Sequence, residues 1–129
     1  MIPQSILLID DNHSCITLIK FVLEQDTNWQ ILIATNAEEG ITKAKLKQPD
    51  VILLDIMMPI LDGLDIYKML KSDIYTSNIP IIFMTAMTPI TPILKSKIAE
   101  DVDVIIKPFD VTKLAEQITE MCKRYYFSV

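Results

Sequence analysis

The stretch Val51-Ile52-Leu53-Leu54-Asp55 decides the fold class of this chain. Four consecutive apolar residues without polar alternation are typical of a strand buried on both faces, as in a parallel sheet covered by helices. A carboxylate, Asp55, follows the run directly. The stretch therefore predicts a central strand of an α/β protein with an acidic group at its carboxyl end.

Four more short apolar runs share this character, since each is too short for a helix and is bounded by polar or turn residues. The five predicted strands are residues 6–9, 29–34, 51–54, 79–84 and 102–106.

The segments between these strands have helical periodicity. Five helices are predicted. The first has apolar residues over 15–23, the third covers 63–73, and the fifth has an apolar stripe over 111–125. The second begins at Asn36, with Glu39 placed almost as in a capping box, and the fourth is confined by Pro89 and Pro92 to residues 92–100. Short connections between alternating strands and helices imply parallel strands, right-handed crossovers and helices on both faces. We expect an α/β fold, a doubly wound (βα)5 five-stranded parallel sheet, as one domain over residues 1–129.

Composition excludes several classes of protein. Half of the 129 residues are hydrophobic and 22% are charged, so the chain can bury a core and is not disordered. No apolar run approaches the roughly 18 residues that cross a bilayer. Because no basic residue precedes Lys20, the positive region of a secretory signal is missing. We expect a cytoplasmic protein that does not bind a membrane.

Charge and cysteine content narrow the classes further. The formal net charge is −5, and the only dense basic stretch is residues 43–47, which argues against direct nucleic-acid binding. Cys15 and Cys122 lie far apart without metal-ligand spacing. We expect two packed thiols that are not joined in a disulfide.

Polar residues follow four of the predicted strands, at the edge where ligands bind in open parallel sheets. Each has an ordinary explanation alone, such as a helix cap, a turn hydroxyl or a solvated charge. Together they would place three carboxylates, a hydroxyl and an ammonium on one edge. The residues are Asp10 and Asp11, Asp55, Thr85 and Ala86, and Lys107 and Pro108.

Such a cluster suits phosphoryl chemistry. Two carboxylates about 4 Å apart repel by roughly 4 kcal/mol at an effective dielectric constant of about 20, so a cation is the natural compensator. Oxygen ligands without His or Cys favour Mg²⁺. Asp55, alone on the central strand, is the best nucleophile, while Thr85 and Lys107 could stabilise phosphoryl oxygens.

These residues resemble the receiver domain of two-component response regulators, the family of the single-domain chemotaxis regulator, over essentially the whole chain. The resemblance rests on the acidic pair Asp10-Asp11, on Asp55-Ile-Met-Met-Pro59 with Gly63, on Thr85-Ala86, and on Lys107-Pro108-Phe109, in this order and spacing. It implies a flavodoxin-like receiver fold and a signalling domain rather than a metabolic enzyme.

The resemblance also implies a role for each matching position. Asp55 would be the phosphoacceptor. Asp11 would bind Mg²⁺ directly, Asp10 mostly through water, and Met57 through its carbonyl. Thr85, followed by Ala86, would be the switch residue, and Lys107 would pair with the phosphoryl group before a cis bond to Pro108. Position 104, usually Tyr or Phe in this family, is Val104, which departs from the usual switch aromatic.

The implied function is a phosphorylatable switch in a two-component phosphorelay. A histidine kinase or phosphotransfer protein would supply the phosphoryl group, and the fourth helix, fifth strand and fifth helix would form the face for a downstream protein. Two alternatives stay open. One is a receiver-like scaffold that works without phosphorylation, which Val104 supports. The other is an Asp-nucleophile phosphatase, which usually has a second Asp where this chain has Met57.

Overall fold

The computed structural model describes residues 3–56, 63–85, 103–107 and 109–127. Its strands are β1 (Ser5–Ile9), β2 (Gln30–Ala34), β3 (Val51–Asp55), β4 (Ile81–Thr85) and β5 (Asp103–Ile106). Its helices are α1 (His13–Asp26), α2 (Ala37–Lys47), α3 (Gly63–Ser72), the 3₁₀ turn η1 (Val111–Lys113) and α5 (Leu114–Phe127). The predicted fourth helix, residues 92–100, lies outside the described residues.

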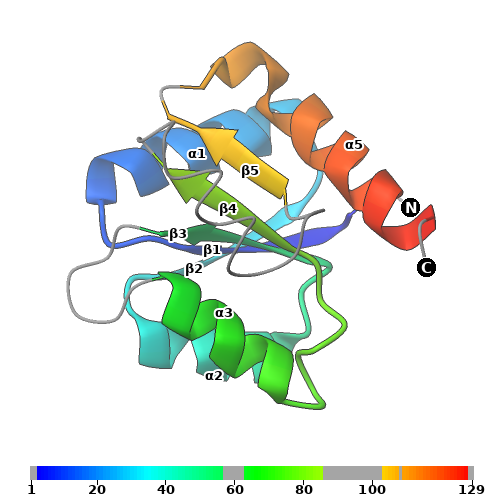
Figure 1. Cartoon of the computed structure of the whole chain (residues 1–129). Coiled ribbons are helices and arrows are strands. Elements are labelled where there is room, and N and C mark those ends of the chain that lie inside the picture. Colours follow the sequence, from blue (N-terminus) through cyan, green and yellow to red (C-terminus); the bar gives the residue numbers. More distant parts are fainter. Residues whose placement is uncertain (1–2, 57–62, 86–102, 108, 128–129) are drawn as a thin grey trace.

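The strands form one parallel sheet in the order β2-β1-β3-β4-β5. Helices α1 and α5 cover one face, and α2 and α3 cover the other (Figure 1). The predicted doubly wound parallel sheet is confirmed. Its central strand is β3, whose five residues are all buried.

The side-chain alternation of β3 explains this burial. Val51 and Leu53 belong to the core under α1 and α5, whereas Ile52 and Leu54 belong to the core over α2 and α3. A strand whose side chains pack into a core on each face of the sheet needs apolar residues at successive positions, and the sequence has this pattern.

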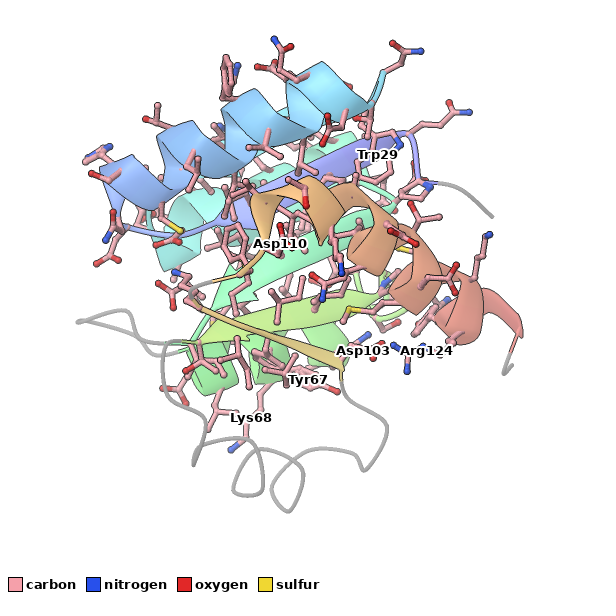
Figure 2. All side chains as sticks on the ribbon, turned by 90° about the horizontal axis from the view of Figure 1, so that it is seen from above. Trp29, Tyr67, Lys68, Asp103, Asp110 and Arg124 are labelled. Atoms are coloured by element: carbon pink, nitrogen blue, oxygen red, sulfur yellow. The ribbon has the colours of Figure 1, made fainter. Side chains whose placement is uncertain are left out.

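Several predicted boundaries were wrong by one or two residues. The strand predicted to begin at residue 79 begins at Ile81, because the Ile79 N–H donates to the Thr76 carbonyl in a turn and Pro80 has no N–H. The strand predicted to begin at Trp29 begins at Gln30, and Trp29 lies at the end of the sheet opposite the carboxyl ends of the strands (Figure 2).

The edge strand β5 is tied to the last helix. Arg124 of α5 donates to the Asp103 carboxylate at 2.9 Å, and the two side chains lie next to each other in Figure 2. Across the described residues, no helix is long and apolar enough to span a bilayer.

Candidate functional site

The strand ends bring the predicted polar residues to one edge of the sheet. β3 ends at Asp55 and β4 at Thr85, while Asp10 directly follows β1 and Lys107 directly follows β5. Because all neighbouring strands are parallel, their carboxyl ends share this edge. The order of the sheet therefore assembles a site from residues up to 97 positions apart.

Three carboxylates form the acidic part of the site. Asp10, Asp11 and Asp55 each offer an oxygen, and these oxygens lie within 4.8 Å of one another. Asp10 is fully buried and Asp55 is 6% exposed, whereas Asp11 is exposed to solvent. The cluster therefore combines two buried acids with one acid that solvent reaches.

Lys107 supplies the opposite charge. Its Nζ lies 3.2 Å from Asp10 Oδ2 and 3.7 Å from Asp55 Oδ2. Desolvation acts to lower the pKa of Lys107, but the charges of Asp55 and Asp10 outweigh it and raise that pKa above its ordinary value. The Lys107 N–H donates to the Thr85 carbonyl at 2.7 Å, so the lysine is also fixed to the end of β4 through its backbone.

Asn12 holds Asp10 at the start of α1. Its N–H donates to Asp10 Oδ1 at 2.9 Å, and its side chain caps the helix by accepting from the Cys15 N–H at 3.0 Å. One residue thus links the orientation of Asp10 to the position of α1. Burial raises the pKa of the Cys15 thiol, so this cysteine is not an activated nucleophile.

Gly63 positions Asp55 from the other side. Its N–H donates to the Ile56 carbonyl at 3.0 Å. A Cβ at this position would lie 2.7 Å from Ile56 Cα and 2.9 Å from the Asp55 carbonyl oxygen, both of which are backbone atoms. Only glycine lets the start of α3 approach the end of β3 this closely.

The donor set fits a hard divalent cation. Its side-chain ligands are carboxylate oxygens without His, and such sets suit Mg²⁺. A cation bound among the three acids would relieve the repulsion that Lys107 compensates only in part. The carbonyl of Met57, the fourth predicted ligand, lies outside the described residues, as do Ala86 and Pro108.

Val104, at the position of the predicted switch aromatic, lies beside an aromatic pair that the sequence did not reveal. Thr85 is fully buried, and Val104 pairs with Phe83 across β4 and β5. The ring of Tyr67, from α3, meets Phe83 edge-on with centroids 5.3 Å apart, and Tyr67 and Val104 pack against the same core. No local sequence signal reveals this contact, because it joins a helix to a strand.

Comparison with known proteins agrees with this geometry. The profile of the response regulator receiver domain matches residues 6–119. YvrH, a transcriptional regulatory protein of Bacillus subtilis, is 36% identical over 124 residues, which cover 96% of this chain and 51% of that protein. TrcR, a transcriptional regulatory protein of Mycobacterium tuberculosis, is 32% identical over 123 residues, covering 95% and 46%. The chain therefore spans about half the length of these relatives.

Solved structures show the same fold. The N-terminal domain of a response regulator receiver protein from Methanoculleus marisnigri is 31% identical, with a TM-score of 0.74 over 90% of this chain and 94% of that one. The chemotaxis protein CheY4 of Vibrio cholerae is 24% identical, and its TM-score is 0.80 over 91% of this chain and 97% of that one. At this identity the likeness shows the fold alone.

Proposed function

The chain belongs to the family of response regulator receiver domains, the signalling domains of two-component systems, and we propose that it works as a phosphorylatable switch with Asp55 as acceptor. One observation carries the proposal. Asp55 ends the central strand, almost buried, with two carboxylates within 4.8 Å and the Lys107 ammonium 3.7 Å away. Asp10 shares the burial, the acidic cluster and the lysine, but of the three acids only Asp55 belongs to the central strand β3.

In the proposed reaction, an Asp55 carboxylate oxygen attacks the phosphorus of a phosphohistidine or a small acyl phosphate. The new O–P bond makes an acyl phosphate, and the old bond to phosphorus breaks with its electron pair leaving on the donor's imidazole or carboxylate. Bound Mg²⁺ would neutralise charge on the phosphoryl oxygens.

The chain's own residues would orient this reaction. Asp10 and Asp11 would hold the cation, and Met57 would add its carbonyl. Lys107 is already within reach of Asp55 and would pair with a phosphoryl oxygen. The Thr85 hydroxyl would donate to another, with Ala86 beside it and Pro108 aiming the lysine inward.

The proposed partners follow from this chemistry. A histidine kinase or phosphotransfer protein supplies the phosphoryl group, and a downstream protein binds the face formed by the fourth helix, β5 and α5. The relatives named as transcriptional regulators are about twice as long as this chain. Their activity as transcriptional regulators is therefore not assigned to this chain.

A second function, a scaffold that works without phosphorylation, is favoured by one observation. Val104 stands where the family usually has a switch aromatic, and the nearby aromatic ring comes instead from Tyr67. A phosphatase is disfavoured, because position 57 is Met rather than a second Asp.

Incubation with acetyl phosphate and magnesium distinguishes the three functions. Intact-protein mass spectrometry should show one long-lived, acid-labile phosphoryl group per chain for the switch. No adduct would favour the scaffold, and rapid turnover of phosphate esters would favour the phosphatase.

A further inference from the structure

The ammonium of Lys71, on α3, is surrounded by carbonyls and aromatic rings. It donates to the carbonyls of Ser77 and Ile79 at 3.1 and 3.0 Å. It also lies 5.9 Å from the ring centroid of Tyr67 and 5.7 Å from that of Tyr125, distances at which a cation is attracted to the face of a ring. Burial lowers the pKa of Lys71, and a desolvated ammonium interacts with a ring more strongly than an exposed one. We refer to Lys71, Tyr67 and Tyr125 as the lysine bridge.

The lysine bridge joins the two helix layers of the fold. Tyr67 and Lys71 belong to α3 on one face of the sheet, whereas Tyr125 belongs to α5 on the other (Figure 1). The two layers meet around the amino end of β4, where the Tyr125 hydroxyl also donates to the Asn78 carbonyl at 3.1 Å. A movement of α3 relative to β4 therefore acts on the last turn of α5, although these helices lie on opposite faces of the sheet.

The same bridge reaches the core beside the proposed phosphorylation site. The Tyr67 ring meets Phe83 edge-on with centroids 5.3 Å apart. Phe83 is fully buried and stands two residues before Thr85 on β4, so both side chains point to the same face of the sheet. Because a close-packed core has few voids and low compressibility, a shift of β4 at Thr85 is transmitted to Tyr67. Lys71 lies four residues after Tyr67, on the same face of α3.

The other end of the bridge is the part of α5 that is held least firmly. The first half of α5 is fixed by packing, since Leu114 and Ile118 are fully buried in the core shared with α1. The last turn depends on polar contacts, in which Arg124 donates to the Asp103 carboxylate at 2.9 Å and Tyr125 donates to the Asn78 carbonyl at 3.1 Å. Exposed polar contacts contribute less than buried apolar side chains. The last turn is therefore the part of α5 that a small displacement of Lys71 would move.

We propose that Lys71 couples the phosphorylation site to the last turn of α5. The inference rests on the proposed phosphorylation of Asp55 and names a regulatory contact of that site. When Thr85 moves toward a phosphoryl oxygen, Phe83 and the Tyr67 ring follow it, and the ammonium changes its position against the Tyr125 ring. The ammonium makes this contact directional, because it has to face two rings and two carbonyls at once. A methyl group in its place would fill the space without imposing that geometry.

Fluorine NMR of the full chain labelled with 3-fluorotyrosine tests the coupling, with beryllofluoride and magnesium as the phosphoryl mimic. The four tyrosine resonances are assigned by replacing one tyrosine at a time with phenylalanine. In wild type, beryllofluoride should shift the resonances of Tyr67 and Tyr125 but not that of Tyr75, which is 70% exposed and outside the bridge. In Lys71→Met the Tyr67 shift should remain and the Tyr125 shift should be lost.

Three further variants separate coupling from loss of packing. Lys68→Met is the matched control, because it removes an exposed lysine from the same helix, and it should leave both shifts unchanged. Lys71→Arg keeps a cation that stacks on aromatic rings and should retain the Tyr125 shift. Lys71→Gln keeps a donor for the carbonyls but no charge. It should also lose the Tyr125 shift, and it takes the place of Lys71→Met if urea unfolding shows that Lys71→Met does not fold.

The affinity for beryllofluoride gives a second readout that a purely structural role would not change. Because coupling between two sites is reciprocal, Lys71→Met should change this affinity by about fivefold or more, whereas Lys68→Met should not change it.

Two results would overturn the inference while leaving the phosphorylation proposal intact. In the first, beryllofluoride shifts the amide resonances of Asp55 and Thr85 but not the Tyr125 resonance. In the second, the Tyr125 shift and the affinity are the same in Lys71→Met as in Lys68→Met, and the bridge is then a structural contact only. If beryllofluoride shifts no resonance, including the amides of Asp55 and Thr85, the phosphorylation proposal itself fails and this inference fails with it.

Discussion

Replacing Lys107 with methionine tests whether this lysine compensates the acidic cluster. Its Nζ lies 3.2 Å from Asp10 Oδ2 and 3.7 Å from Asp55 Oδ2. At an effective dielectric constant of about 20 these distances correspond to attractions of about 5 and about 4 kcal/mol. Desolvation of the partly buried ammonium offsets much of this sum. We expect a net loss of about 3 kcal/mol of unfolding free energy when the acids are left unpaired.

The assay is urea unfolding at neutral pH with chelator and again with magnesium. Lys123→Met is the control, because its 3.9 Å pair with Glu120 is exposed and contributes at most about 1 kcal/mol. Magnesium should stabilise Lys107→Met more than wild type, because the variant lacks the cation that competes for the same oxygens. The reasoning would be refuted if Lys107→Met lost no more unfolding free energy than Lys123→Met, or if magnesium stabilised Lys107→Met and wild type equally.

The raised pKa of Lys107 fixes the sign of its pH dependence. Lys107 binds its proton more tightly in the folded protein than in the unfolded chain. Its contribution to the unfolding free energy is therefore complete at any pH below its pKa in the unfolded chain, and it is lost as the pH rises through its pKa in the folded protein. The difference between wild type and Lys107→Met should therefore persist through neutral pH and shrink only above the ordinary lysine pKa of 10.5.

Three more results are expected. Asp11→Ala should weaken magnesium binding in calorimetry more than Asp10→Ala, because the exposed carboxylate is the proposed direct ligand; equal losses would contradict this. Burial raises the pKa of Cys122 from 9.0 to about 11, so the buried thiol contributes fully to the unfolding free energy below pH 9, and about 2–3 kcal/mol of that free energy should be lost as the pH rises from 9 to 11. The unfolding free energy of Cys122→Ala should not show this alkaline loss, and a pH profile identical to that of wild type would contradict the assignment. Gly63→Ala should lower the unfolding free energy by about 1–3 kcal/mol. Gly40→Ala should cost less, since its Cβ meets only a side chain; the reverse order in urea unfolding would be contradictory.

The fold was predictable because burial leaves a strong local signal. Val51 to Leu54 are apolar without interruption, since β3 feeds two cores, and the structure places them as expected. The capping signal at Asn36 also held: its side chain accepts from the Glu39 N–H at 2.8 Å. Both cysteines are free thiols, as predicted.

The convergence of the site residues was also predictable, because a parallel sheet brings strand ends to one edge. Asp10, Asp55 and Lys107 meet there through topology alone. The roles of these residues in phosphoryl transfer stay a prediction, and so do those of Met57, Ala86 and Pro108.

Contacts that depend on three-dimensional packing were not predictable. Lys71 donates to the Ser77 and Ile79 carbonyls and lies within 6 Å of the ring centroids of Tyr67 and Tyr125, and burial lowers its pKa. These partners come from α3, from the turn before β4 and from α5. The sequence marked Gly63 as part of a motif, but its close approach to the Asp55 backbone depends on how α3 packs against the end of β3.

The central claim is that Asp55 accepts the phosphoryl group, and borohydride trapping tests it most directly. The protein would be phosphorylated with acetyl phosphate and magnesium, reduced with borohydride to convert phosphoaspartate to homoserine, digested, and mapped by peptide mass spectrometry. Homoserine should appear at position 55, and Asp55→Asn should show no adduct although it folds normally. Homoserine at Asp10 or Asp11, or undiminished phosphorylation of Asp55→Asn, would contradict the account.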